Sequence, residues 1–403
     1  MRRLLPVLLL LSGGCVAPAA SEPVGPAAAQ PPAAASEAER FRADARSIEP
    51  LIASVYAYPE RFGGARPLSD RLRAEAEQVR DQPSLLRYAE RALAALADYH
   101  AITGASFSDS YAVVPSYSDL WIERVDGAYR ISSVRQGSPA AAAGVREGSL
   151  LTAVDGVPAE QAVQAFWADL GLPVTEDRAG FAARVLAAGR RDRPRRLSIR
   201  SASGEERTLE LPNLYSTGRP GRPPLTAAEE GGDLVIRIND SLGDGATVAA
   251  FDSAMAAARP GQRVVIDLTD TPGGGNTVVA RAMLGWFVDR PTFYQMHSLP
   301  AEERESGIPR QWVEQVLPRA GKRHRGPVRV LVGRWTGSMG EGLALGFDAI
   351  GAEVVGGPMA GLLGAIYDHR LEHSGLVLKI PTERLSHVDG TPREAFLPPR
   401  APR

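Results

Sequence analysis

Apolar residues recur at helical spacing where the globular part of the chain begins. Five of them are three or four positions apart and would share one helix face: Phe41, Ala45, Ile48, Ile52 and Val55. Ser36 and Glu39 precede most of this stripe with the spacing of a capping box, which satisfies free backbone N–H groups at a helix start. Two further helical patterns follow, near residues 72–79 and 85–97. We therefore predict a small N-terminal helical cap domain over residues 36–106.

The pattern then changes from helical spacing to short strands over residues 107–211. Four apolar or alternating runs predict strands at residues 129–131, 150–154, 197–199 and 209–211. The sequence Gly-Ser-Pro-Ala at 137–140 separates the first two runs and supplies turn and helix-start residues. We predict a compact β domain here.

Strands and helices alternate in the last part of the chain, residues 228–403. Continuous apolar runs typical of buried strands lie at residues 234–238, 264–268 and 328–332. Helical segments near residues 246–258, 276–288 and 338–350 separate or follow them. This order predicts an α/β domain, in which sites are built at the ends of the strands.

The first fifteen residues have the pattern of a bacterial lipoprotein signal. Arg2 and Arg3 precede an apolar run that is too short to span a bilayer, and small residues then lead to Cys15. Cys15 is the only cysteine in the chain, so no disulfide and no cysteine nucleophile is expected. We predict a signal peptide at 1–15 with lipidation of Cys15; an ordinary secretory peptide with an incidental cysteine is the alternative.

The composition agrees with a location outside the cytoplasm. Residues 16–35 are rich in Ala and Pro and are expected to form a tether rather than a core. Val16 follows the cysteine where an Asp would favour inner-membrane retention, so we expect a lipid anchor on the periplasmic face of the outer membrane. The 46 basic and 47 acidic side chains nearly balance, which argues against nucleic acid as a partner.

A glycine-rich loop follows the predicted strand at 264–268. The sequence Thr-Asp-Thr-Pro-Gly-Gly-Gly occupies residues 269–275 and allows close backbone approach to a ligand. A phosphate-binding loop would need Lys followed by Ser or Thr, whereas Asn276 and Thr277 stand there. An oxyanion hole needs only well-placed N–H groups from such a loop, so that function is retained as a hypothesis.

Ser338 occupies the turn between the strand at 328–332 and the following helix. A serine in this position presents its hydroxyl at a helix N-terminus, which favours negative charge. Taken alone, Ser338 and Glu341 would more often be an ordinary capping box. The glycine loop one βα unit earlier makes a nucleophile the better interpretation.

The combination of motifs resembles the C-terminal processing and tricorn-type serine peptidases. The Gly-Ser-Pro-Ala segment is similar to that of a PDZ domain, and Ile-Asp-Leu with Pro-Gly-Gly, then Thr-Gly-Ser-Met-Gly-Glu, follow in the family's order. The resemblance implies a crotonase-like or ClpP-like α/β core. It also implies that Ser338 is the nucleophile, with Gly273, Gly274 and the N–H of Met339 forming the oxyanion hole.

One position departs from the Ser/Lys members of the family. Their lysine lies in a Gly-Lys-Gly turn, whereas this chain has Gly-Leu-Leu-Gly at 361–364, so a Ser/Lys pair is excluded. The tricorn-like branch uses a histidine that precedes its PDZ domain. The resemblance places His100 there as the base and Glu394 as the third member. His387 is the alternative base among the five other histidines.

These observations predict a serine endopeptidase anchored in the bacterial cell envelope, acting on peptides or unfolded proteins. No metal or organic cofactor is implied, and the oligomeric state is not indicated. A catalytically inactive relative that uses its PDZ region as a peptide-binding or scaffold module is the main alternative. An acyl-CoA enzyme on the same fold would leave the signal segment and the PDZ region unexplained.

Overall fold

A computed structural model describes residues 36–217 and 222–399. The signal peptide, Cys15 and the tether predicted at residues 16–35 lie outside these residues. Within the described part of the chain, no helix is long and apolar enough to cross a membrane.

The helical cap consists of three α-helices and a short 3-10 turn: α1 Glu37–Val55, η1 Pro59–Phe62, α2 Asp70–Ala76 and α3 Gln82–Ala94. The predicted stripe forms as expected, since Ala45, Ile48 and Ile52 are fully buried. Asp81 caps α3 by accepting the backbone N–H of Ser84, and the Ser84 hydroxyl oxygen in turn accepts the backbone N–H of Asp81. Local capping therefore starts this helix.

A six-stranded antiparallel sheet follows, in the order β2-β3-β4-β6-β7 with β5 beside β4. Its elements are β2 Leu120–Val125, β3 Ala128–Val134, α4 Pro139–Ala142, β4 Leu150–Val154, β5 Val157–Pro158, α5 Ala159–Asp169, α6 Glu176–Ala188, β6 Arg195–Arg200 and β7 Glu206–Leu211. Ser138 caps α4, with Pro139 at the first helical position. The helices α5 and α6 were not expected from the strand pattern.

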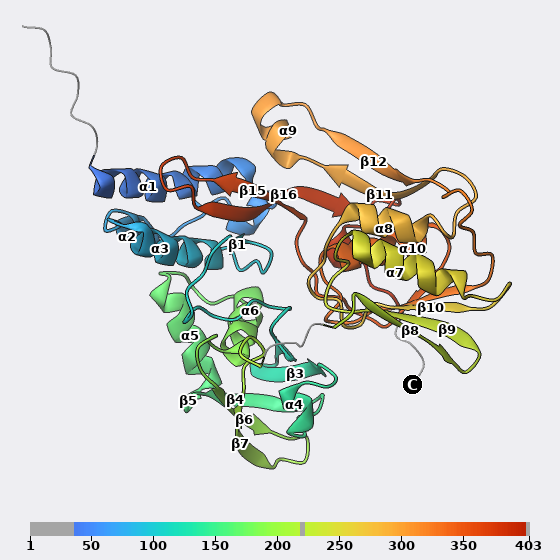
Figure 1. The fold of residues 1–403 in the computed structure, drawn as a ribbon. Coiled ribbons are helices and arrows are strands. Elements are labelled where there is room, and N and C mark those ends of the chain that lie inside the picture. Colours follow the sequence, from blue (N-terminus) through green and yellow to red (C-terminus); the bar gives the residue numbers. More distant parts are fainter. Residues whose placement is uncertain (1–35, 218–221, 400–403) are drawn as a thin grey trace, which may run out of the picture. The chain divides into compact units, whose positions relative to one another are not determined.

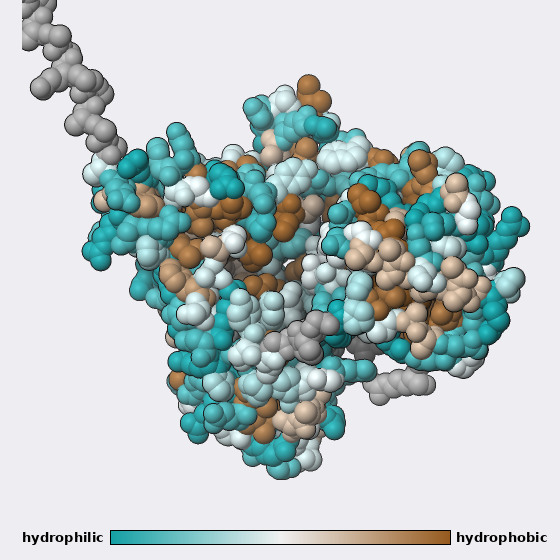
Figure 2. All heavy atoms as spheres, viewed as in Figure 1, coloured by the Kyte–Doolittle hydropathy of each residue, from teal (hydrophilic) through white to brown (hydrophobic). Residues whose placement is uncertain are grey.

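The α/β core contains a mainly parallel sheet in the order β14-β13-β10-β9-β8, with β8 antiparallel (Figure 1). Its elements are β8 Leu225–Glu230, β9 Asp233–Ile238, α7 Gly245–Ala256, β10 Val264–Asp267, α8 Thr277–Leu284, β13 Val328–Leu331, α10 Met339–Ala349 and β14 Glu353–Val355. The helix α8 packs against both α7 and α10. The predicted alternation of strands and helices is confirmed here. On the face shown in Figure 2, α7 presents a largely apolar surface, in keeping with its alanine content.

A second, antiparallel sheet lies against the other side of α10. Its elements are β1 Ile102–Thr103, β11 Thr292–Ser298, α9 Pro300–Ser306, β12 Gln311–Val316, β15 Ala365–Arg370, β16 Val377–Ser386 and the 3-10 turn η2 Arg393–Ala395. The long strand β16 pairs with β11 and β15, and also with β1 from the helical cap. The turn between β15 and β16 donates the N–H groups of His373 and Ser374 to Asp44 of α1. The end of the chain thus ties the cap to the core.

Two hydrophobic clusters hold these layers together. One joins the helical cap, the PDZ-like sheet and part of β16, and the other fills the α/β core. Trp335 and Leu362 belong to the first cluster, whereas Met339 belongs to the second. The segment around Ser338 therefore lies where the two clusters meet.

Candidate active site

Ser338 is held in a backbone conformation, with a positive φ, that residues other than glycine rarely adopt. It follows β13 and immediately precedes α10, with φ 53° and ψ −118°. Such conformations carry a cost and are retained where the surrounding structure requires them. The Ser338 hydroxyl lies within hydrogen-bond distance of His100. Glu341 Oε2 accepts the Ser338 N–H at 2.8 Å and so holds the start of α10.

His100 approaches Ser338 from the helical cap. Its Nε2 lies 3.0 Å from Ser338 Oγ, and its Nδ1 lies 2.8 Å from the carbonyl oxygen of Leu363. A carbonyl oxygen can only accept, so Nδ1 carries the proton and Nε2 keeps its lone pair toward the serine. The structure thus fixes the tautomer that a general base requires.

Burial determines the charge state of this histidine. Removal from water, followed by the nearby positive charge of Arg393, lowers the pKa of His100 to about 4, although the Leu363 carbonyl opposes the shift. The imidazole is therefore neutral at neutral pH. Because the folded pKa is lowered, its contribution to stability is present above about pH 6.5 and is lost as the pH falls through about 4.

The turn at residues 361–364 is held from two sides. Glu341 is fully buried and accepts the backbone N–H groups of Gly361 and Leu362 in addition to that of Ser338. Arg393, only 2% exposed, donates to the carbonyl oxygens of Leu362 and Gly364. The two side chains fix the turn that offers its Leu363 carbonyl to His100.

Burial also acts on Glu341. It raises the pKa of this carboxyl to about 7, against the opposing effects of the Arg393 charge and the three backbone N–H groups. The sequence identified Glu341 only as a possible helix cap and did not single out Arg393. Glu341 ends the Thr-Gly-Ser-Met-Gly-Glu motif and Arg393 directly precedes Glu394, but nothing in their spacing indicates a contact with the 361–364 turn.

Asp98 supports the backbone of the histidine. Its Oδ1 accepts the His100 N–H at 2.9 Å, and its Oδ2 accepts the Tyr56 hydroxyl at 2.9 Å. Burial raises the pKa of Asp98 to about 6 in spite of these two hydrogen bonds. The Asp-Tyr-His sequence thus holds the ring in place through the main chain and does not bring the Asp98 carboxylate to Nδ1.

The glycine loop lies directly against the serine. Gly274 has φ +64°, and a Cβ on it would lie 2.7 Å from Ser338 Oγ and 3.0 Å from Met339 N. Only glycine fits this approach. Gly273 donates its N–H to the Asp240 carbonyl at 2.8 Å, so this group is already occupied. In the part of the chain that the structure describes, the N–H groups of Gly274 and Met339 have no such partner, and both residues lie directly beside Ser338.

Glu394 does not contact His100. It lies in the 3-10 turn η2, which directs the neighbouring Arg393 into the active site. Its Oε2 is buried and has no hydrogen-bond partner within residues 36–217 and 222–399. The structure therefore brings Ser338, His100, Gly274 and Met339 together, but the group at His100 Nδ1 is a main-chain carbonyl, where the sequence comparison led us to expect Glu394.

The other histidines have contacts elsewhere. His387, the alternative base, lies between Asp348 and Asp389 and stacks on Phe396. His297 pairs with Glu383, His324 contacts the Gln262 carbonyl, and His369 contacts Thr382. The backbone N–H of His373 binds Asp44. Among the described residues, no group of three His, Cys, Asp or Glu side chains could hold a metal ion.

The PDZ-like sheet contacts the loop that carries Ser338. Trp335 donates its ring N–H to the Ser118 carbonyl at 2.8 Å, and Arg334 binds Glu123 of β2 at 2.5 Å. Arg184 of α6 donates to the Ile122 carbonyl, on the edge strand β2. Peptides bind PDZ domains by adding a strand to a sheet edge, and here part of β2 is already occupied by these side chains.

Comparisons with known proteins agree with this architecture. Residues 234–396 match the model for peptidase family S41, and residues 130–166 match a PDZ domain. The photosystem II D1 C-terminal processing protease has a similar structure, with a TM-score of 0.55 and 15% identity over 89% of this chain and 92% of that chain. Mature CPAF, solved in complex with lactacystin, gives a TM-score of 0.53 and 14% identity over 90% and 94% of the two chains.

At these identities the structural likeness shows the fold alone. No curated protein matches the sequence. The predicted fold class, a mixed α/β chain with a PDZ domain and a peptidase core, is confirmed, and so is the resemblance to the serine peptidases.

Proposed function

We propose that this chain, a peptidase with an S41 core and a PDZ domain, is a serine endopeptidase in which Ser338 is the nucleophile and His100 the base. The observation that carries the proposal is the pair of contacts on His100. Its Nε2 faces Ser338 Oγ at 3.0 Å while its Nδ1 proton is bound by the Leu363 carbonyl. This is the geometry that transfers a serine proton to a neutral imidazole.

Acylation follows from that geometry. As Ser338 Oγ attacks the carbonyl carbon of a peptide bond, its proton passes to His100 Nε2. The negative charge that develops on the carbonyl oxygen is stabilised by the N–H groups of Gly274 and Met339 and by the N-terminus of α10. The C–N bond then breaks, and His100 returns the proton to the leaving amine. An acyl ester on Ser338 and a free amine remain.

Deacylation uses the same groups in reverse order. A water molecule gives a proton to His100 Nε2 and attacks the ester carbonyl, and the same N–H groups bind the oxyanion. Ser338 then leaves with the proton from His100, releasing a carboxylic acid. No step requires a metal ion, an organic cofactor or a lysine at the 361–364 turn.

A fluorophosphonate probe tests whether Ser338 is activated, and a labelled unfolded protein such as casein tests endopeptidase activity. We expect wild-type protein to be labelled and to cleave internal bonds, with Ser338→Ala losing both properties. Ser203→Ala, in an exposed turn, is the matched control. An unlabelled wild-type protein that still binds peptides would instead support the scaffold alternative.

We further propose that the enzyme is held at the cell envelope by a lipid on Cys15. The support is the sequence alone: two arginines, a short apolar run and small residues before the single cysteine. Cys15→Ser should shift the protein from the membrane to the soluble fraction of cells without changing its peptidase activity. Equal membrane association of the variant would contradict the anchor.

A further inference from the structure

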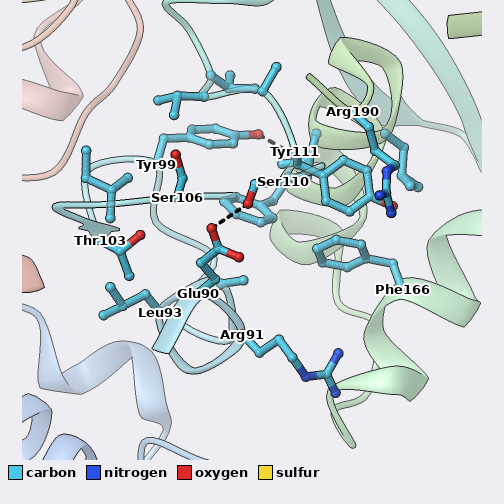
Figure 3. A pocket seen from close by; sticks show the side chains of 18 of the residues that line it. Glu90, Arg91, Leu93, Tyr99, Thr103, Ser106, Ser110, Tyr111, Phe166 and Arg190 are labelled. Atoms are coloured by element: carbon cyan, nitrogen blue, oxygen red, sulfur yellow. Dashed lines mark hydrogen bonds between the residues drawn. The ribbon is translucent and has the colours of Figure 1, made fainter. Parts of the chain in front are cut away.

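A cavity of about 520 Å³ lies between the helical cap and the helices of the PDZ-like region (Figure 3). Its walls come from α3, α5, α6 and the segment from Asp98 to Val114. This volume falls within the usual range for small-molecule sites, about 300–1,000 Å³. Ser338 does not line it. The cavity is therefore distinct from the candidate site at Ser338.

One wall of the cavity is aromatic. Tyr99 stacks on Phe181 with ring centroids 4.5 Å apart, and Phe166 contacts Phe181 and Tyr111 at 6.4 and 6.1 Å. The ring of Tyr111, from a residue that is 41% exposed, lies beside Phe166 in Figure 3. Exposed aromatic rings in a concave site bind apolar side chains at little conformational cost.

A carboxyl group projects into the cavity from the opposite side. Glu90 of α3 is half-buried and accepts the Ser110 hydroxyl at 2.5 Å, and Figure 3 shows this pair facing the aromatic wall. Burial raises the pKa of Glu90, against the Ser110 hydrogen bond and the charges of Arg87 and Arg191, so a further cation beside the carboxyl group would favour its ionised form.

Arg191 supplies the opposite charge. Three other arginines line the cavity, and each is paired with at least one carboxylate: Arg87 with Asp109 and Glu90, Arg91 with Glu75 and Asp169, and Arg190 with Asp109 and Asp192. Arg191 differs, because in the described part of the chain its side chain has no carboxylate partner. It donates to the Ser106 hydroxyl and the Tyr111 carbonyl and lies over the ring of Tyr215 at 4.6 Å. Glu90 and Arg191 are close enough to influence one another electrostatically.

We propose that this cavity binds a short apolar peptide of two or three residues, with its N-terminal ammonium on Glu90 and its C-terminal carboxylate on Arg191. The apolar side chains then lie on Phe166, Tyr111 and Tyr99. A fatty acid would present no cation to Glu90, and a simple amine would leave Arg191 without an anion. The assignment of such peptides as reaction products rests on the proposed peptidase function; the binding itself does not.

The wall next to α3 gives this site a physical connection to the base. Asp98, Tyr99, Ala101 and Ile102 line the cavity, and the residue between them is His100, whose side chain points the other way to Ser338. A ligand in the cavity would contact the segment that positions the imidazole. A product peptide bound in the cavity would in this way influence the position of His100 without contacting Ser338.

Isothermal titration of Ser338→Ala protein with the tripeptide Ala-Ala-Phe tests the proposal without turnover. We expect saturable binding that weakens about tenfold or more in Glu90→Gln and in Arg191→Gln, because each loses a charge-assisted contact. The peptide acetylated at its N-terminus and amidated at its C-terminus should bind more weakly than the free zwitterion. Arg66→Gln, at an exposed position outside the cavity, is the matched control.

Thermal melting confirms that each variant is folded, and Phe166→Leu provides a milder change in the aromatic wall. No binding at millimolar peptide would overturn the proposal. So would equal binding by the capped peptide, equal binding by both charge variants, or binding of decanoate but not of the peptide. Failure of wild-type protein to cleave peptides would instead contradict the proposed function and leave this binding result unaffected.

Discussion

The proposed nucleophile, Ser338, and the proposed base, His100, are held by different kinds of structure. Ser338 owes its position to its own turn: a positive φ, the start of α10, and a glutamate three residues further along the chain. His100 owes its position to a turn 263 residues away, which supplies the Leu363 carbonyl. The position of Ser338 is therefore set by local structure, whereas the position of His100 depends on tertiary structure. A single substitution should affect the two residues differently.

The largest expected effect comes from removing either reacting group. Ser338→Ala and His100→Ala should each lower kcat/KM by roughly three to six decades, and the double variant should be little worse than either alone, because the groups act as one unit. Kinetics on a peptide that the enzyme cleaves provide the measurement. Activity that survives His100→Ala but not Ser338→Ala would move the base to another residue, with His387→Ala as the next variant.

The pH dependence should reveal how strongly the base side is buried. A histidine with its ordinary pKa near 6.5 would lose most of its neutral form by pH 5. Since the pKa of His100 is lowered to about 4, we expect the base to stay neutral at pH 5 and the acid limb of kcat/KM to lie near pH 4. Side-chain NMR of labelled histidine, assigned with His100→Ala, measures this titration directly. A midpoint of 6 or above for His100 would contradict the buried, carbonyl-bound arrangement.

A change in the backbone of the 361–364 turn should displace the acceptor of His100 and leave the turn at Ser338 intact. Gly364 has φ +51°, and a Cβ there would overlap the Glu383 carbonyl oxygen, so Gly364→Ala should displace the turn. We expect kcat to fall about tenfold to a hundredfold, with labelling by a fluorophosphonate slowed to a similar extent. Gly375→Ala, at a positive φ in the distant β15–β16 turn, is the matched control for strain alone. Equal loss in both variants would mean that general destabilisation is the cause.

Glu394→Gln should have a small effect. The carboxylate makes no hydrogen bond to His100, so its removal should change kcat by less than about tenfold, in contrast to the loss expected for a residue that orients the base. Steady-state kinetics at pH 7 are sufficient. A loss of a thousandfold in folded protein would restore Glu394 as the third member of the catalytic group.

The smallest effect is expected for the side chain of Leu363. Leu363→Ala keeps the carbonyl that accepts the hydrogen bond from His100 Nδ1–H, so kcat should remain within about threefold of wild type. Melting temperatures would account for any packing change. A large loss would show that the side chain, and not the main chain, has a role at the active site.

This contrast also explains what the sequence could and could not predict. The strand, glycine loop and serine turn lie in contiguous motifs, so Ser338 and the loop at Gly274 were identified from local pattern together with the family resemblance. His100 was identified only because of its place ahead of the PDZ domain. The contribution of Arg393 was missed, since its contacts with the Leu362 and Gly364 carbonyls join positions about thirty residues apart.

Other features depend on contacts that no local pattern encodes. The pairing of β1 with β16 brings the segment after His100 to the last long strand of the core. The aromatic cavity forms only when α3, α5 and α6 come together, and the two helices of the PDZ-like region were not expected at all. The strands predicted at residues 150–154 and 197–199 lie on either side of these alanine-rich helices, and the pattern was interpreted as strands alone.

The use of a main-chain oxygen to orient the histidine has a consequence for the way this site can vary. Every amino acid has the same carbonyl group, so position 363 can exchange its side chain without removing the acceptor that binds His100 Nδ1–H. The backbone path at residue 363, and not its side chain, places this acceptor beside His100. A position-by-position comparison of sequences would therefore overlook it. Replacement of the Leu363–Gly364 amide by an ester, through chemical ligation, would weaken that one acceptor while leaving every side chain as it is.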